Sequence, residues 1–434
     1  MEGILSKIFK YSLRSDKSSL FLVLKDSTFF HKVLETFATR VFIIGIGVVT
    51  TAMVSRILGP EGRGLYAIAI VISAMGVQFC NLGLHTSNTY FGAKNKNLLS
   101  AQLGNSILVS FGFGTFIAVS LWMFFQFFPE IIPVKGFLLI LSLASVPLGL
   151  AYLLVQNLVL GLYETRLYNR VEILNKILSV LLIAIIIFIG AVRVEVLFLV
   201  GFISSIISLI WVFKKIRPYL SGPAYCSFRL FNESIKYGFK AYLAALFAFL
   251  VIRVDLLMVQ HICGTEQAGL YSVSVSLAEY AGMVPIIVAT ILFPRLSAMH
   301  SNDEKMKFTF LVTILIAMFV LGIALFLWVF AEPIIRILYG PKFINAKPAF
   351  VFLLPGMVFI GTQTVLVQFL NSIGFPKAIV YVWGSCLLLN IGLNLWMIPR
   401  YSIAGASMVS SICSLYVLIL VVINIYRTVY ATQK

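Results

Sequence analysis

Two short glycine-rich segments, one in each half of the chain, repeat the same residue pattern between long apolar runs. Residues 57–66 read Ile-Leu-Gly-Pro-Glu-Gly-Arg-Gly-Leu-Tyr, and residues 262–271 read Ile-Cys-Gly-Thr-Glu-Gln-Ala-Gly-Leu-Tyr. The isoleucine, two glycines, the glutamate, the leucine and the tyrosine coincide in the two copies. Each copy separates one apolar run from the next, as a tight reversal between two helices would. The pattern therefore predicts two homologous halves.

The apolar runs are long enough to cross a lipid bilayer. Of the 434 residues, 60% are hydrophobic and 11% are charged, whereas about 25% of the residues in soluble domains are charged. A soluble fold would lack the polar side chains that cover its surface, but lipid favours an apolar exterior. The runs are continuous rather than alternating over about ten residues, which argues against a transmembrane β-barrel. We therefore predict an all-α, polytopic membrane protein.

A basic segment at residues 214–236 divides the predicted helices into two sets of six. The predicted organisation is a basic cytoplasmic tail (1–30), an N-terminal six-helix lobe (31–213), the basic linker (214–236) and a C-terminal six-helix lobe (237–434). An even number of helices in the first half gives both halves the same orientation, as in parallel repeats. Because a span needs about 20 apolar residues, twelve helices are expected near 33–57, 63–91, 99–127, 134–160, 168–190, 194–215, 237–261, 267–293, 306–330, 347–371, 377–397 and 402–427.

The net charge of +17 is explained by loops rather than by nucleic-acid binding. Lys and Arg collect in cytoplasmic loops of membrane proteins. With both termini placed in the cytoplasm, the inner loops hold more than twice as many basic residues as the outer ones. We therefore expect cytoplasmic termini, both glycine-rich segments on the outer side, and no nucleic-acid partner.

Five charged residues inside the predicted spans are the candidate site residues, because charges in a membrane usually face a cavity or a partner. Arg253 and Asp255 lie deep in the seventh span and, being two residues apart, have different neighbours. They either line a cavity or fix helix packing. Arg40 and Lys240 lie at similar depths in the first helix of each half and predict a positive entrance suited to phosphate or pyrophosphate, although Arg40 could also snorkel to the headgroups. Glu279 could couple to ions, contact sugar hydroxyls or support a helix contact.

Two further patterns predict local contacts. Glu172 and Lys176 are four residues apart and are expected to pair along one helix. A polar stripe at helical spacing in the second span predicts a cavity wall, and it comprises Gln78, Asn81, His85 and Asn88.

Motifs of soluble enzymes are missing from the sequence. The segment Gly59–Gly64 lacks the Gly-Lys-Ser/Thr ending of a phosphate-binding loop, and neither HExxH nor GxSxG occurs. The five cysteines are scattered without metal-ligand spacing. We expect a transporter rather than an enzyme, with no cofactor and no metal.

Four segments resemble the bacterial polysaccharide and O-antigen flippases of the multidrug/oligosaccharidyl-lipid/polysaccharide exporter superfamily. They are Ser-Arg-Ile-Leu-Gly-Pro-Glu-Gly-Arg-Gly-Leu-Tyr at 55–66, Arg-Val-Asp-Leu-Leu at 253–257, Ala-Gly-Leu-Tyr-Ser at 268–272 and Phe-Pro-Arg-Leu-Ser at 293–297. The resemblance implies twelve helices in two lobes around a central cavity, in the bacterial inner membrane.

The resemblance also implies a function. Such proteins move undecaprenyl-pyrophosphate-linked oligosaccharide, for example an O-antigen repeat unit, from the cytoplasmic to the outer leaflet by alternating access. The implied partners are this lipid-linked oligosaccharide, membrane lipids, a polysaccharide polymerase with chain-length proteins, and a coupling ion. Arg253 and Asp255 would be cavity residues.

Two other functions remain open at this point. A drug or cation antiporter of the same superfamily would present acidic residues to its cargo, whereas the spans of this chain hold more cations than acids. A membrane-embedded polysaccharide-assembly enzyme would show a large extramembrane loop or a carboxylate pair near a loop, and the longest predicted loop is the basic 214–236 segment.

Overall fold

The protein is an all-helical bundle in the described part of the chain, which in this computed structural model comprises residues 27–299, 301–374 and 378–432. The predicted basic tail lies outside these residues up to position 26. The first half consists of α3 (Ser27–Cys80), α4 (Leu84–Lys94), η1 (Lys96–Leu98), α5 (Leu99–Ile107), η2 (Leu108–Phe113), α6 (Gly114–Phe127), α7 (Gly136–Gly161), α8 (Thr165–Ile189), α9 (Val194–Ile216) and η3 (Arg217–Tyr219). The second half consists of α10 (Phe228–Cys263), α11 (Thr265–Ala281), α12 (Met283–Ala298), α13 (Asn302–Val329), α14 (Ala331–Tyr339), η4 (Pro341–Ala346), α15 (Lys347–Ser372) and α16 (Ala378–Thr432).

Two of these helices each contain two membrane spans joined at a kink. In α3 the backbone turns at Gly59 (φ 68°), and in α16 it turns at Ser402 (φ 52°). Ten segments of the described residues are long and apolar enough to cross a membrane, and the two kinks raise the number of crossings to twelve. The all-α, twelve-helix prediction is therefore confirmed.

The seventh helix begins earlier in the chain than predicted. Helix α9 ends at Ile216, but α10 already begins at Phe228, inside the basic segment 214–236. Ser227 caps α10 by accepting a hydrogen bond from the backbone N–H of Leu230, which satisfies one of the free donors at a helix start. The first span of the second half is thus longer than its apolar run.

The second span of each half is interrupted. In the first half α3 stops at Cys80, and Leu82 (φ 51°) and Gly83 (φ 82°) lead into α4. In the second half Gly282 separates α11 from α12. Each interruption lets the second part of the span take a direction different from the first.

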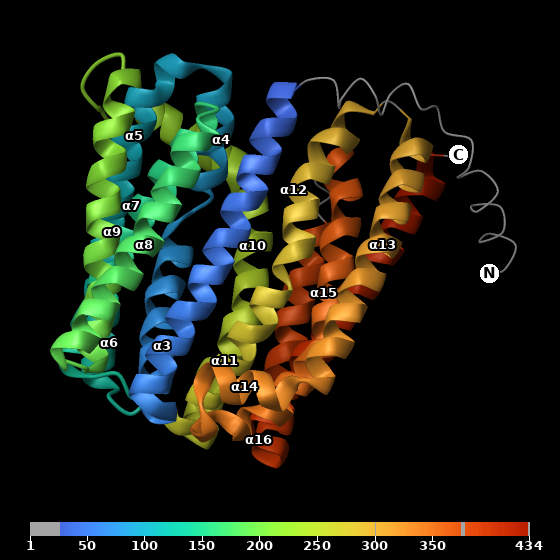
Figure 1. The fold of residues 1–434 in the computed structure, drawn as a ribbon. Coiled ribbons are helices and arrows are strands. Elements are labelled where there is room, and N and C mark those ends of the chain that lie inside the picture. Colours follow the sequence, from blue (N-terminus) through green and yellow to red (C-terminus); the bar gives the residue numbers. More distant parts are fainter. Residues whose placement is uncertain (1–26, 300, 375–377, 433–434) are drawn as a thin grey trace, which may run out of the picture.

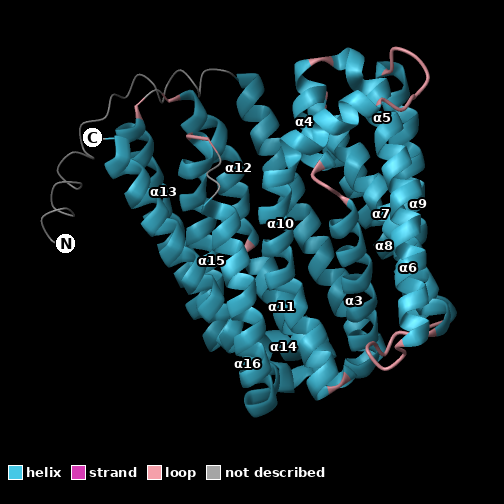
Figure 2. Ribbon diagram, turned by 180° about the vertical axis from the view of Figure 1, so that it is seen from behind, coloured by secondary structure: helices cyan, strands magenta, loops and turns pink. Residues whose placement is uncertain are grey.

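The two halves form two lobes that meet at the α14 end. Towards the other end α10 stays packed against α4, where Gly83 lies against Gly238, while the outer helices of the two lobes diverge (Figure 1). In Figure 1 and Figure 2 α12, α13 and α15 lean away from α4, α5 and α9 at the end opposite α14. At the α14 end the two glycine-rich segments pack against each other: Gly64 lies against the backbone of Thr265, and Gly269 lies against the backbone of Pro60. These contacts are equivalent under the repeat, which confirms the predicted pair of lobes.

Large apolar side chains on the outer helices point away from the bundle. Phe188 on α8 is 93% exposed, and Phe116 on α6 and Trp328 on α13 are also exposed. Exposed aromatic and aliphatic side chains in such number suit a lipid environment. Buried apolar residues hold the helices together within each lobe and also across the interface between the lobes.

Candidate functional site: a cavity between the lobes

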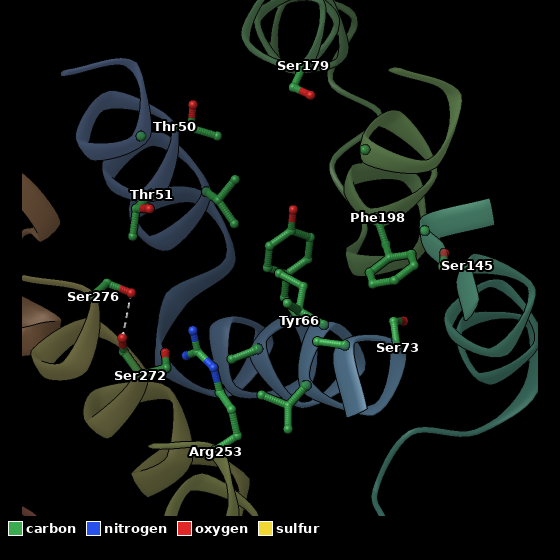
Figure 3. Close-up of a pocket in the computed structure, with 18 of the residues that line it drawn as sticks. Thr50, Thr51, Tyr66, Ser73, Ser145, Ser179, Phe198, Arg253, Ser272 and Ser276 are labelled. Carbon is green, nitrogen blue, oxygen red and sulfur yellow. Dashed lines mark hydrogen bonds between the residues drawn. The ribbon is translucent and has the colours of Figure 1, made fainter. Parts of the chain in front are cut away.

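A cavity of about 630 Å³ lies between the two lobes. Its wall is formed by α3, α7, α8 and α9 of the N-terminal lobe and by α10 and α11 of the C-terminal lobe. Figure 3 shows Tyr66 and Arg253 extending into the enclosed space from opposite lobes. The cavity is large enough for the polar part of a substrate.

Hydroxyl groups from both lobes line this cavity. Most of them donate their proton to a backbone carbonyl of their own helix: Thr50 Oγ1 donates to Ile46, Ser179 Oγ to Asn175, and Ser276 Oγ to Ser272. With the proton engaged, the lone pairs of the oxygen remain free to accept hydrogen bonds. The lining hydroxyls labelled in Figure 3 are those of Thr50, Thr51, Tyr66, Ser73, Ser145, Ser179, Ser272 and Ser276.

Arg253 and Glu279, both predicted from the sequence, form an ion pair in the cavity wall. The Nη2 atom of Arg253 on α10 lies 3.1 Å from Oε1 of Glu279 on α11. About a third of the Arg253 side chain and 39% of the Glu279 side chain are exposed. The pair links the first two spans of the C-terminal lobe and leaves part of each group accessible from the cavity.

Asp255 lies close to this pair but has other partners, as its spacing from Arg253 predicted. It is 3% exposed. Its Oδ2 atom accepts hydrogen bonds from the hydroxyls of Tyr271 (2.5 Å) and Ser410 (3.1 Å), and its Oδ1 atom accepts one from the backbone N–H of Leu256. The carboxylate thus joins α10, α11 and α16.

Arg63 lines the cavity, although it belongs to the glycine-rich segment 57–66, which was predicted to lie on the outer side. It is 7% exposed and lines the cavity near its closed end. Its guanidinium lies 5.7 Å from the centre of the Tyr66 ring, and Nη2 donates to Ser276 Oγ at 3.4 Å, while Nε has no hydrogen-bond partner among the described residues. The available signal was the difference between the two glycine-rich copies, because Ala268 takes its place in the second.

Arg40 and Lys240 do not line the cavity. Arg40 donates to Glu172 Oε2 at 2.7 Å and lies near Tyr168, which ties α3 to α8 inside the N-terminal lobe. Glu172 thus forms its close ion pair with Arg40 on the neighbouring helix, and Lys176 on its own helix interacts with the same carboxylate only electrostatically. Lys176 lines the cavity, and Lys240 is exposed on α10.

The predicted polar stripe of the second span is also not part of the cavity wall, so that prediction is wrong. Asn88 donates to Ser106 and to the backbone carbonyl of Leu154, and Asn81 bonds to His85. Asn81, His85 and Asn88 thus find hydrogen-bond partners within the N-terminal lobe.

Contacts between the lobes close one end of the cavity. The hydroxyls of Thr51 on α3 and Tyr280 on α11 are 2.7 Å apart. Arg56 at the end of the first span donates to the backbone carbonyls of Ile337 and Leu338 on α14. Together with the glycine contacts of the two repeated segments, these bonds hold the α14 end shut.

A second cavity of about 400 Å³ lies within the C-terminal lobe. It is bounded by α10, α11, α12, α15 and α16, and mostly apolar side chains line it. Arg253, Asp255 and Glu279 line both cavities. Together with Ile252 and Val275, these three charged residues therefore lie between the two cavities.

A comparison with protein families matches residues 53–348, more than half of the chain, to the family described as "Polysaccharide biosynthesis protein". The match includes both glycine-rich segments and every charged residue that lines the cavity. It confirms the resemblance found in the sequence.

Three curated relatives are 22–25% identical to this chain over the matched residues. A Shigella flexneri protein whose name proposes O-antigen transport is 22% identical over 85% of this chain and 90% of its own length. The succinoglycan biosynthesis transport protein ExoT of Rhizobium meliloti is 22% identical over 78% of this chain and 68% of its own. An uncharacterized membrane protein of Methanocaldococcus jannaschii is 25% identical over 45% of this chain, a match that spans 40% of that relative.

Solved structures share the fold at 14% identity. An inward-facing multidrug resistance MATE family transporter of the MOP superfamily superimposes with a TM-score of 0.73 over 91% of this chain and 98% of its own. The lipid II flippase MurJ, in an inward closed conformation, gives a TM-score of 0.69 over 92% of this chain and 87% of its own. This chain belongs to the polysaccharide biosynthesis protein family, and it shares the two-lobe fold of these solved transporters.

Proposed function

We propose that this protein is a flippase for a lipid-linked oligosaccharide, carried as an undecaprenyl-pyrophosphate-linked repeat unit of O-antigen or another surface polysaccharide. The observation that carries the proposal is the cavity of about 630 Å³ between the lobes, with hydroxyl acceptors on both walls and charged groups at its closed end. Sugar hydroxyls can donate to those oxygens, and basic groups can bind pyrophosphate. The polyprenyl chain would stay in the lipid.

The arrangement of the lobes supports alternating access. The cavity is shut at the α14 end by the two repeat-equivalent glycine contacts and by the Thr51–Tyr280 hydrogen bond. Towards the other end α12, α13 and α15 lean away from the first lobe (Figure 1). Rocking the two lobes about such a contact exchanges the open and closed ends. With both termini in the cytoplasm, as proposed from the loop charges, the described state would face inward.

The remaining parts of the proposal follow from the sequence. The lobes are assigned to residues 31–213 and 237–434 with the linker 214–236 between them, in a bacterial inner membrane. Lys240, which is exposed on α10, is proposed to attract the anionic headgroup at the entrance, whereas Arg40 is paired with Glu172 and holds α3 against α8. A polymerase with its chain-length proteins would receive the flipped unit, and an ion could drive its movement.

The test uses proteoliposomes that contain the purified full-length protein and a fluorescent polyprenyl-pyrophosphate oligosaccharide. Accessibility of the sugar to an externally added lectin or glycosidase reports its transfer between leaflets. The proposal expects transfer at a rate at least tenfold above that of protein-free vesicles. Transfer at the background rate in vesicles with correctly folded protein would refute it. A parallel assay with a fluorescent organic cation tests the antiporter alternative.

A further inference from the structure

The first part of α10, residues 228–242, is packed against the N-terminal lobe at the end opposite α14. Gly83, where the chain passes from α3 to α4, lies so close to Gly238 of α10 that a methyl group on either glycine would overlap the backbone of the other. Small residues allow the backbones of two membrane helices to approach this closely. The lobes therefore stay connected at the end where α12, α13 and α15 lean away from the first lobe (Figure 1).

Two side chains on the same part of α10 strengthen this contact. The Tyr242 hydroxyl donates to the backbone carbonyl of Phe79 at 3.1 Å. Because α3 ends at Cys80, a carbonyl in its last turn lacks the usual donor from a following turn, and Tyr242 supplies one. The ring of Tyr237 is stacked on that of Tyr90 of α4, with the ring centroids 4.1 Å apart and an angle of 16° between the ring planes. These contacts hold α10 against α3 and α4.

The linker before α10 is docked on α5 of the N-terminal lobe. The Asn105 side chain donates to the backbone carbonyl of Ser227 at 3.0 Å and accepts from the backbone N–H of the same residue at 2.9 Å. Ser100 Oγ donates to the carbonyl of Gly222 at 3.2 Å, and the N–H of Tyr225 donates to the carbonyl of Ser100 at 3.4 Å. Since Ser227 also caps α10, the helix starts from a segment that is fixed to the N-terminal lobe.

Beyond this part, α10 packs against the C-terminal lobe. Ala244 and Val251 are buried in an apolar cluster with residues of α15 and α16. The Phe247 ring lies against Gly384 of α16. The helix thus passes from contacts with one lobe to contacts with the other within a single turn that begins at Tyr242.

The contacts of residues 228–242 differ from those at the α14 end in what alternating access requires of them. Opening the α14 end must break the hydrogen bond between Thr51 and Tyr280 and separate Gly64 from Thr265. The opposite end must close at the same time, and closing brings the lobes nearer to each other. The contacts of residues 228–242 with α3, α4 and α5 are therefore compatible with both states.

We propose that residues 222–242 are a fixed anchor between the lobes, and that the C-terminal lobe swings about the point where α10 leaves this anchor, at residues 242–244. The inference rests on the proposed function, because it assigns the hinge of the alternating-access movement. The two repeats are divided at the linker, but the two moving bodies are divided inside α10. The linker is then a docked strap and not a flexible tether.

Cross-linking tests whether the anchor stays closed while cargo is moved. Two accessible cysteines of the full-length protein, the exposed Cys226 and the half-buried Cys263, are first replaced by serine. Tyr90→Cys with Tyr237→Cys then places two thiols where the native rings are stacked. Bridging them with a short bismaleimide should leave the rate of oligosaccharide transfer in proteoliposomes within about twofold of that of the unbridged variant, because this contact does not have to open.

The matched control is a bridge at the α14 end. Thr51→Cys with Tyr280→Cys, where the native hydroxyls are 2.7 Å apart, should lower the transfer rate by roughly tenfold or more when bridged, because this contact has to open. An equal loss in the bridged anchor variant overturns the inference. Full activity in both bridged variants also overturns it, because the lobes would then not part at the α14 end. A wild type that moves no oligosaccharide refutes the proposed function instead.

Spin-label distances in lipid nanodiscs test the anchor without any cargo. Labels at the exposed positions Lys94 on α4 and Lys236 on α10 report the anchor, and labels at Lys94 and Glu304 on α13 report the separation of the lobes at the same end. When Gly64→Ala opens the α14 end, the Lys94–Lys236 distance should stay unchanged and the Lys94–Glu304 distance should shorten. A Lys94–Lys236 distance that changes as much as the Lys94–Glu304 distance overturns the anchor, even if the wild type moves oligosaccharide.

Discussion

Gly64 on α3 packs directly against the backbone carbonyl of Thr265 on α11, so that a methyl group in place of its hydrogen would overlap the carbonyl oxygen. The repeat-equivalent Gly269 stands in the same relation to Pro60. The closed end of the cavity therefore depends on two glycines that bring the backbones of the two lobes together.

Replacing either glycine should shift the protein away from the closed state. Gly64→Ala and Gly269→Ala are expected to separate α3 and α11 at this end, because backbone cannot move aside as a flexible side chain does. Spin-label distances across the α14 end would lengthen, and transport would fall at least tenfold. Gly45→Ala on the same helix meets nothing within 4 Å and serves as the control. Unchanged spin-label distances in both Gly64→Ala and Gly269→Ala would contradict this prediction.

Removing Arg253 alone should impair transport more than removing Arg253 and Glu279 together. Arg253→Ala leaves the Glu279 carboxylate unpaired in the cavity wall, where it would repel an anionic cargo. We expect surface polysaccharide display to fall at least tenfold, with the protein still in the membrane. Arg253→Lys should retain part of the activity. Adding Glu279→Ala to Arg253→Ala should recover activity, as a double-mutant cycle would show. Normal surface polysaccharide display by Arg253→Ala would contradict the proposed role of Arg253 in transport.

The hydrogen bond from Tyr271 to Asp255 should contribute to the stability of the C-terminal lobe. Tyr271→Phe leaves a buried carboxylate with one fewer donor, and the loss is expected to be about 1–2 kcal/mol of unfolding free energy. Tyr339→Phe is a matched control, because the Tyr339 hydroxyl is buried and has no hydrogen-bond partner among the described residues. Denaturant titration in detergent measures both. Equal stabilities of the two variants would show that the Tyr271–Asp255 hydrogen bond does not stabilise the protein.

Exchanging the charges of Arg40 and Glu172 should show that this ion pair stabilises the N-terminal lobe through its charges. Arg40→Glu or Glu172→Arg alone places like charges where the native groups are 2.7 Å apart and should lower the thermal stability of the N-terminal lobe. The double exchange should restore most of it, since a partly exposed pair is worth about 1 kcal/mol. Differential scanning fluorimetry checks this. A double variant as unstable as either single one would show that the pair does not act through its charges.

The charged residues show which contacts could be predicted from the sequence and which could not. Spacing along α10 correctly gave Arg253 and Asp255 different neighbours, because helix geometry is local. It could not show that Glu279 lies across from Arg253, or that Glu172 prefers Arg40 on another helix to Lys176 on its own. These choices depend on how helices distant in the sequence pack together.

By itself, the sequence determined the membrane class, the twelve spans and the twofold repeat, since apolar run length and a repeated turn are properties of the chain alone. Only the tertiary structure decided which charges are neutralised and which face the cavity. Arg63 shows the difference: its position next to a turn suggested an outer loop, but the packing of Gly64 against Thr265 draws that turn into the lobe interface and buries the guanidinium at the closed end.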